Sequence, residues 1–127
     1  FKLLAFDYDV ESGEASGCSA SCEIPSDFGY ADGMCMDADD NVWIAHWVSG
    51  KISKWNPRTG ELIETVQMPV PHATCCGFGG ENYDVMFVTT ARLWIDEAEL
   101  ETMYSNAGGI YTFKPGVQGR ESYMFNG

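Results

Sequence analysis

The chain has 127 residues, 45% of them hydrophobic and 13% aromatic, which is enough for one globular domain and excludes a disordered polyelectrolyte. Nineteen acidic against seven basic residues give a formal net charge of −12, which argues against nucleic acid and anionic membrane as partners. No run approaches the roughly 20 apolar residues that span a bilayer, and the opening FKLLAFDYD becomes acidic too early for a signal peptide. We therefore expect a soluble protein.

The first residue and the cysteines lead to two further expectations. The chain begins with Phe1 in what looks like the middle of a strand, so we expect a fragment of a longer protein. Five cysteines are an odd number, and they lack the paired spacings of a disulfide scaffold or a zinc ribbon: Cys18, Cys22, Cys35, Cys75 and Cys76. We expect reduced, mostly buried thiols and a cytoplasmic location.

Short runs rich in aromatic and β-branched residues alternate with turn residues, and this pattern predicts a mainly β protein. The predicted strands, in chain order, are KLLAFDYD, NVWIAHW, KISKWN, ELIETVQM, YDVMFVTT and GGIYTFKPG, most of them joined by tight turns such as VESGE, VSG and PRTG. The exception is the connection from Arg92 to Asn106. There the acidic residues from Asp96 onward favour a short helix, which Leu93 and Trp94 could hold in place.

A weak internal repeat indicates the fold class. FDYDVESGE, ending at Glu14, and SKWNPRTGE, ending at Glu61, match at a spacing of about 47 residues, and YTFKPGVQG from Tyr111 is a displaced third copy. A period of about 45 residues with four short strands is typical of a propeller blade. The chain would then hold roughly two and a half blades, and closed propellers need at least about four.

The acidic stretch from Asp37 to Asn41, DADDN, opens like the calcium loop of an EF-hand. That loop requires glycine at its sixth position and glutamate at its twelfth, where this chain has Val42 and Val48. The EF-hand interpretation therefore fails, and the aspartates with the asparagine predict a short hairpin turn. We expect Asp37, Asp39 and Asp40 to be solvated.

Asp32 lies in a different context. It precedes Gly33, which allows the backbone to bend closely, and the apolar segment MCM, which in a propeller would be the innermost strand beside the central channel. A carboxylate near a core must be paired, hydrogen-bonded or metal-bound. Asp32 is therefore the candidate for a metal-binding or catalytic role.

The histidines and the adjacent cysteines are weaker candidates. His46 and Trp47 predict an aromatic cluster around a half-buried histidine between blades. His72 with Cys75 and Cys76 could suggest a thiol nucleophile or a zinc site, but no second Cys-x-x-Cys pair exists and adjacent strand residues point to opposite faces. The start of this strand, at Thr74 and Cys75, could instead form a channel wall that contacts substrate.

Three motifs, DGMCMDADDNVWIA, TCCGFGG and AGGIYTFKPGVQG, occur in an order and at spacings that are specific enough to indicate a family. With the segments between them they cover nearly the whole chain, which resembles the C-terminal half of the regucalcin (senescence marker protein), gluconolactonase and luciferin-regenerating enzyme family. The resemblance implies an all-β chain that forms about two and a half to three blades of a six-bladed β-propeller. Residues 1–127 would be the C-terminal part of that single propeller domain.

The same resemblance implies a function. Many members are lactonases that depend on a divalent metal, so Asp32, on the family's D-G-M motif, would be both a metal ligand and the general base. The metal would be calcium or zinc, with manganese and magnesium as further candidates. The family's glutamate and asparagine ligands have no counterpart in this chain. The implied partners are a small-molecule sugar lactone and either the N-terminal half of the propeller or a second copy of this chain.

Two functions of other classes stay open. One is a calcium-binding regulatory protein of the same fold with no important turnover, which the acidic composition permits. The other is an inactive structural or interaction fragment, which the missing metal ligands favour.

Overall fold

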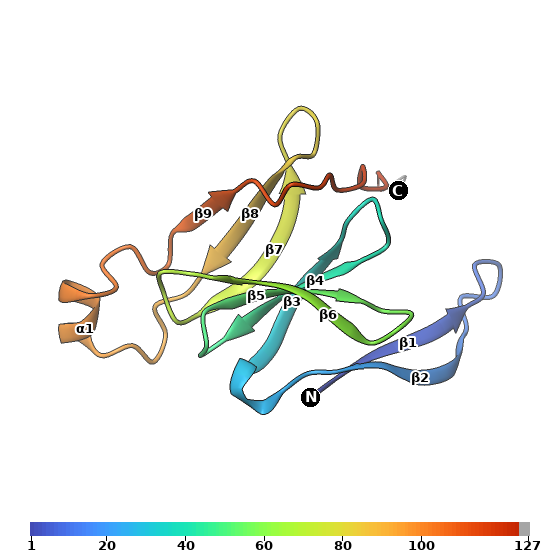
Figure 1. Ribbon diagram of the computed structural model, residues 1–127, viewed down its shortest axis with the longest axis horizontal. Coiled ribbons are helices and arrows are strands. Elements are labelled where there is room, and N and C mark those ends of the chain that lie inside the picture. Colours follow the sequence, from blue (N-terminus) through green and yellow to red (C-terminus); the bar gives the residue numbers. More distant parts are fainter. Residues whose placement is uncertain (125–127) are drawn as a thin grey trace.

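Three antiparallel β-sheets make up the fold, as a computed structural model describes it for residues 1–124 (Figure 1). The first sheet is a hairpin of two strands, the central sheet has four and the last has three. In chain order the strands are β1 (Lys2–Tyr8), β2 (Ala15–Glu23), β3 (Tyr30–Met36), β4 (Val42–Trp47), β5 (Lys51–Asn56), β6 (Glu61–Gln67), β7 (Ala73–Gly79), β8 (Val85–Thr90) and β9 (Ile110–Phe113). A 3-10 turn, η1 (Ser26–Phe28), precedes β3, and one short helix, α1 (Glu97–Thr102), lies between β8 and β9.

The strand order matches that of propeller blades. The central sheet runs β3-β4-β5-β6, so consecutive strands are neighbours, as in a four-stranded blade. The predicted runs NVWIAHW, KISKWN and ELIETVQM correspond to β4, β5 and β6. The all-β prediction is confirmed for the residues that the structure describes.

One strand, β2, was not predicted from the sequence. β2 has the sequence ASGCSASCE, whose small residues carry little β-propensity. It forms because β1 pairs with it along its whole length, from Lys2 opposite Glu23 to Tyr8 opposite Ala15. Pairing with a partner strand has therefore overridden a weak local preference.

The central sheet has a hydrophobic core on each of its faces. Side chains of β4 alternate between the two: Trp43 and Ala45 belong to the core shared with β7 and β8, and Val42 and Ile44 to the core shared with Cys22 and the η1 region. Because both faces are covered, β4 is almost completely buried and shows no polar alternation. This double burial makes the central blade the most enclosed part of the chain.

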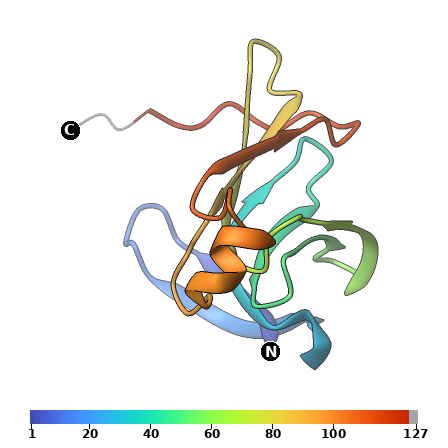
Figure 2. The ribbon, with the colours of Figure 1, turned by 90° about the vertical axis from the view of Figure 1, so that its left-hand side faces the viewer.

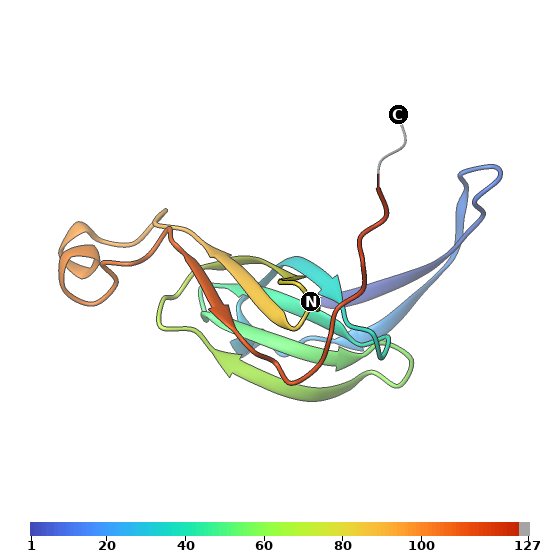
Figure 3. The same ribbon diagram turned by 90° about the horizontal axis from the view of Figure 1, so that it is seen from above.

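The helix stands apart from the sheets. None of its residues is buried, and it begins at the N-cap Asp96, whose carboxylate accepts a hydrogen bond from the backbone N–H of Ala98 at 2.9 Å. In the view that faces it, α1 lies in front of the sheets, and from above, α1 and the tip of the β1–β2 hairpin lie at opposite ends of the molecule (Figures 2 and 3). The predicted insertion with a short helix is therefore confirmed.

The segment after β9 returns to the acidic turn of the central sheet. The backbone N–H of Ala38 donates to the carbonyl of Gln118 at 2.8 Å, and that of Gly119 donates to the carbonyl of Tyr83 at 2.8 Å. The last sheet is thereby connected to the hairpin between β3 and β4. Within residues 1–124, no helix has the length and apolar character needed to cross a membrane.

Candidate functional site

Asp32 occupies a β-bulge in the first strand of the central sheet. In the pairing of β3 with β4, Ala31 lies opposite His46 and Met34 opposite Ile44, so Asp32 and Gly33 together face the single residue Ala45. Such a bulge redirects a side chain out of the regular alternation. The carboxylate of Asp32 is exposed, and within residues 1–124 it has no hydrogen bond or ion pair.

Gly33 allows β3 to approach β7 closely at this bulge. A Cβ atom placed on Gly33 would lie 2.5 Å from the Sγ atom and 2.7 Å from the Cα atom of Cys75. Only glycine fits so close to another backbone. The close packing of β3 on β7 therefore places Asp32 where the inner strands of two blades meet.

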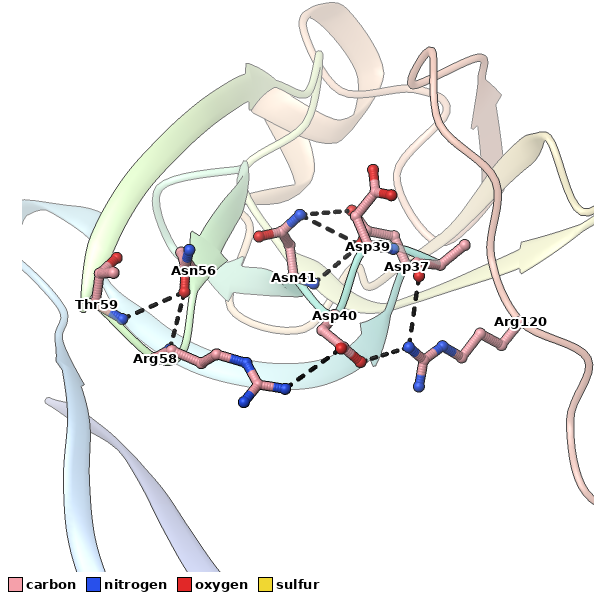
Figure 4. Close-up of polar contacts among 9 residues, drawn as sticks. Asp37, Asp39, Asp40, Asn41, Asn56, Arg58, Thr59 and Arg120 are labelled. Carbon is pink, nitrogen blue, oxygen red and sulfur yellow. Dashed lines mark hydrogen bonds and ion pairs between the residues drawn. The ribbon is translucent and has the colours of Figure 1, made fainter.

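Asp37 contradicts the expectation of a solvated turn. Its side chain is completely buried, and its Oδ2 atom lies 2.9 Å from Nζ of Lys54 and 3.1 Å from Nε1 of Trp43, which donates to it. The backbone N–H groups of Asp39 and Asn41 donate to its other oxygen, Oδ1 (Figure 4). Asp37 is thus a structural anchor of the hairpin.

The ionisation of Asp37 follows from these contacts. Burial by itself raises the pKa of the Asp37 carboxyl, but hydrogen bonds from Lys54, from the backbone of Asn41 and from Trp43, with the charge of Lys54, outweigh burial. Its pKa therefore lies below the ordinary value. The carboxylate is charged and satisfied by protein donors, so it offers no free oxygen to a metal ion.

Asp39 and Asp40 agree better with the expected turn. Asp39 is exposed, and Asp40 adopts a left-handed φ of 65°, which aspartate tolerates in turns. The carboxylate of Asp40 accepts hydrogen bonds from Arg58, at 3.4 Å, and from Arg120 (Figure 4). These partly exposed ion pairs connect the acidic turn to the β5–β6 turn and to the C-terminal segment.

His46 is more deeply buried than the sequence predicted. Its Nε2 atom lies 2.6 Å from Oγ of Ser53, and Nε1 of Trp55 donates to the same oxygen at 2.6 Å. Burial, with a smaller effect from the charge of Lys51, lowers the pKa of His46 to about 4. The imidazole is neutral near pH 7. Phe28 packs edge-on against His46 with ring centroids 5.3 Å apart, but Trp47, which was predicted to share this cluster, packs against His72 instead.

The other histidine packs in a separate cluster and is not part of a thiol site. His72 stacks on Trp47 with ring centroids 4.3 Å apart, and its Nδ1 atom accepts the backbone N–H of Val48 at 3.2 Å. Cys75 is exposed and Cys76 buried, as expected for neighbours on a strand. Thr74 shares a 2.7 Å hydrogen bond with Thr89, and its role as a substrate wall stays a prediction.

The described residues contain no group of three or more histidine, cysteine, aspartate or glutamate side chains that could hold a metal ion. Asp32 nevertheless fits a single ligand position, since an exposed carboxylate with no protein donor is a hard oxygen ligand available to a divalent cation. This part of the chain therefore supplies one candidate ligand.

Two features of the site were missed by the sequence analysis. The first is the buried ion pair of Asp37 with Lys54. The sequence held a weak indication for Asp37 alone, because aspartate at the first position of a turn often accepts backbone hydrogen bonds. The second is the contact between Cys35 of β3 and Cys76 of β7, with the two sulfurs 3.8 Å apart, for which the sequence held no indication, since these residues are 41 positions apart in the sequence.

Comparisons with known proteins agree with this architecture. The family model described as "SMP-30/Gluconolactonase/LRE-like region" matches residues 1–92. Regucalcin from Xenopus laevis and regucalcin from Homo sapiens are each 37% identical to this chain over 128 aligned residues. The alignments cover 100% of this chain and 42% of each relative.

Two solved structures resemble the fold. Luciferin-regenerating enzyme superposes with a TM-score of 0.79 at 30% identity, over 94% of this chain and 40% of that one. A calcium-binding protein, regucalcin, from Agrobacterium tumefaciens superposes with a TM-score of 0.82 at 24% identity over the same shares, which shows the common fold. These neighbours confirm that the chain forms part of a β-propeller.

The chain spans 42% of the length of the regucalcins it matches. The family model nevertheless covers well over half of the chain, and it includes the Asp32–Gly33 bulge, the acidic turn and both strands that carry the cysteine contact. The chain belongs to the SMP-30/gluconolactonase/LRE-like family.

Proposed function

We propose that the intact protein containing this chain hydrolyses a sugar lactone in a reaction that requires a divalent metal ion, and that Asp32 is a metal ligand and the general base. The observation that carries the proposal is the exposed carboxylate of Asp32, free of protein donors within residues 1–124 and set on a bulge between two inner strands. Membership of a family named for gluconolactonase supports a hydrolase of this general kind.

Hydrolysis of a lactone requires water to add to the ring carbonyl and a base to remove a proton from that water. A divalent ion bound at this site would supply the polarisation of the carbonyl oxygen. Asp32 is suited to accept the proton because its carboxylate is exposed and takes no hydrogen bond from the described protein groups. The close packing at Gly33 holds β3 against β7 and keeps the carboxylate in place.

One ligand is too few for a stable metal site, so the proposal includes a partner. The remaining ligands would come from the N-terminal blades of the same propeller, and a second copy of this chain is the less favoured source because it would contribute only another Asp32. Calcium and zinc are the proposed ions, with manganese and magnesium as further candidates. An oxygen ligand suits calcium, magnesium and manganese best.

A second candidate function is calcium binding in a regulatory protein that turns over little substrate. Two observations favour it: the formal net charge of −12, and the description of the Agrobacterium tumefaciens relative as a calcium-binding protein. In this case Asp32 would bind the ion but would not act as a base. The two candidates therefore differ in turnover and agree in metal binding.

The test compares Asp32→Ala with Asp39→Ala in the intact protein. Both residues are exposed and neither side chain has a hydrogen bond or ion pair within residues 1–124. Calorimetric titration with calcium and zinc should show at least about tenfold weaker binding, or ~1.4 kcal/mol, for Asp32→Ala alone. Hydrolysis of gluconolactone should fall by about 10² or more in the same variant.

Equal losses in the two variants would contradict the assignment of Asp32. Loss of metal binding in Asp32→Ala from a parent protein with no lactone hydrolysis would favour the regulatory candidate instead.

A further inference from the structure

We propose that Cys35 and Cys76 form a redox-reactive thiol pair: a hydroperoxide oxidises Cys35, and the product condenses with Cys76 into a disulfide that connects β3 to β7. The proposal rests on geometry that the lactonase proposal does not use. The two Sγ atoms lie 3.8 Å apart across the boundary between the central and the last sheet. A disulfide has an S–S distance of about 2.0 Å, so the sulfurs must approach each other by ~1.8 Å.

The two thiols have different surroundings, which assigns them different roles. Cys35 is partly exposed and lines a pocket of about 710 Å³ together with Phe78, Arg120 and Tyr123. Cys76 is buried, and its sulfur is directed at the backbone carbonyls of Trp43, at 3.4 Å, and Gly33, at 3.9 Å. A small oxidant in the pocket can therefore reach Cys35 but not Cys76.

Ionisation supports the same division of roles. The hydrogen-bond contact between the two thiols lowers the pKa of Cys35, despite its partial burial and the nearby charge of Asp37. The hydrogen bond with Cys35, followed by burial, raises the pKa of Cys76. Redox-sensitive cysteines are typically accessible, have a lowered pKa and lie beside a second thiol that resolves the oxidised product.

The reaction balances with hydrogen peroxide as the oxidant. The thiolate of Cys35 attacks one peroxide oxygen, the O–O bond breaks, and the leaving hydroxide takes up a proton to become water. The sulfur of Cys76 then displaces the hydroxyl group from the sulfenic acid of Cys35, and this hydroxyl leaves as water with the proton of the Cys76 thiol. In sum, two thiols and one peroxide give one disulfide and two water molecules.

Cys75 provides a matched control. It is adjacent to Cys76 and exposed, so accessibility alone would favour its oxidation. Its sulfur, however, packs against Gly33, and within residues 1–124 it has no hydrogen bond with Cys35. If exposure governed the chemistry, Cys75 would react first; if the 3.8 Å contact governs it, Cys35 and Cys76 will be the pair that disappears.

The experiment treats the intact protein with hydrogen peroxide, blocks the remaining thiols and digests it with trypsin and a glutamate-specific protease. Cleavage after Glu23, Lys51, Glu64 and Glu81 releases residues 24–51, with Cys35 as the single cysteine, and residues 65–81, with Cys75 and Cys76. We expect these two peptides to be linked, with a mass two hydrogens below their sum, and the link to disappear on reduction. The same linked product should form in Cys75→Ser.

Two further measurements make the result decisive. In Cys76→Ser, dimedone should label Cys35, because the sulfenic acid has lost its resolving thiol. In the wild-type protein, oxidation should raise Tm by about 5 °C or more, reversibly with dithiothreitol, since the bond closes a long loop. Peroxide treatment that leaves Cys35 and Cys76 reduced, or that links either of them to Cys75 or to another molecule, would overturn the proposal.

Discussion

Asp37 and Lys54 form an ion pair inside the central sheet, where both side chains are nearly or completely out of contact with water. Removing the charge of Lys54 would leave the Asp37 carboxylate buried without a cation. Its remaining side-chain donors would be Trp43 and, through longer contacts, Asn41. A buried charge that loses its partner is strongly destabilising, because its desolvation is no longer compensated. The pair therefore matters for stability in a way that surface pairs do not.

We predict that Lys54→Met lowers the free energy of unfolding by about 3 kcal/mol. The matched control is Lys114→Met, which removes an ion pair with Asp84 at the same N–O distance of 2.9 Å but at the surface. An exposed pair contributes about 0–1 kcal/mol. Urea unfolding of the two variants measures the difference, and equal losses would show that burial of the pair is not the cause.

A second prediction at the residue scale concerns pH. The pKa of His46 falls from 6.5 to about 4 on folding, so between these values the unfolded chain binds a proton that the folded chain does not. Above about pH 6.5, His46 is neutral in both states and does not reduce the free energy of unfolding. As the pH falls toward 4, protonation of His46 in the unfolded chain lowers the free energy of unfolding by on the order of 3 kcal/mol. Asp37, whose pKa is lowered, loses its contribution only at lower pH.

The measurement is the free energy of unfolding at pH 7 and at pH 4.5 for the wild type and for His46→Gln, which keeps a polar group near Ser53 but does not titrate. We expect the loss of stability on acidification to be clearly smaller in the variant. Identical losses would assign the acid sensitivity to other groups, among them His72, whose pKa is also lowered by burial.

At the scale of elements, the contact between β3 and β7 depends on a glycine. A methyl group on Gly33 would meet the Cα atom of Cys75 at 2.7 Å, and backbone cannot move aside as a flexible side chain can. Gly77, on β7, provides the matched control, because a Cβ atom placed there would have no neighbour within 4 Å. The two glycines therefore test close packing separately from the general effect of glycine in a strand.

We predict that Gly33→Ala lowers the free energy of unfolding by about 2 kcal/mol, while Gly77→Ala changes it by less than about 1 kcal/mol. Calorimetric melting of both variants of the intact protein is the measurement. Gly33→Ala should also impair metal binding, since the bulge positions Asp32. A Gly33→Ala protein as stable as the wild type would contradict the close approach of the two strands.

At the scale of the whole molecule, several apolar side chains are exposed on the first hairpin. Leu4 is 51% and Phe6 53% accessible to solvent, and β1 is exposed along almost its whole length. Large exposed apolar patches are rare on soluble monomers. The chain spans 42% of the length of the regucalcins it matches, and we expect further propeller blades to cover these side chains.

We therefore predict that residues 1–127, purified alone, associate with themselves and hydrolyse no lactone. Uncovered strand edges would add to this association, since they offer backbone groups to another chain. Light scattering should give a mass above the monomer value of 14.0 kDa, and addition of calcium, zinc or manganese should not produce turnover. A stable monomer with metal-activated hydrolysis would contradict both the expected self-association and the expected need for metal ligands from outside this chain.

The strands of the central sheet were predictable because their signals are local. Valine, isoleucine and tryptophan between turn residues define β4 and β5, and acidic residues at Asp96 and after it define α1. β2 was not predictable, because its small residues have little intrinsic preference for a strand and β2 forms only by pairing with β1. Asp32 was found from its position before a glycine and an inner strand, and its role as a ligand and base stays a proposal.

By itself, the sequence determined the all-β class, the blade period, the family and the turn between β3 and β4, since each depends on residues close together in the chain or on motifs in a fixed order. Only the tertiary structure decided which aspartate of that turn is buried and which two cysteines meet. Asp37 is enclosed because Lys54 and Trp43 come from two other strands, and Cys35 touches Cys76 because two sheets pack side by side. Burial and contact of this kind arise from packing between segments distant in the sequence, which no local pattern specifies.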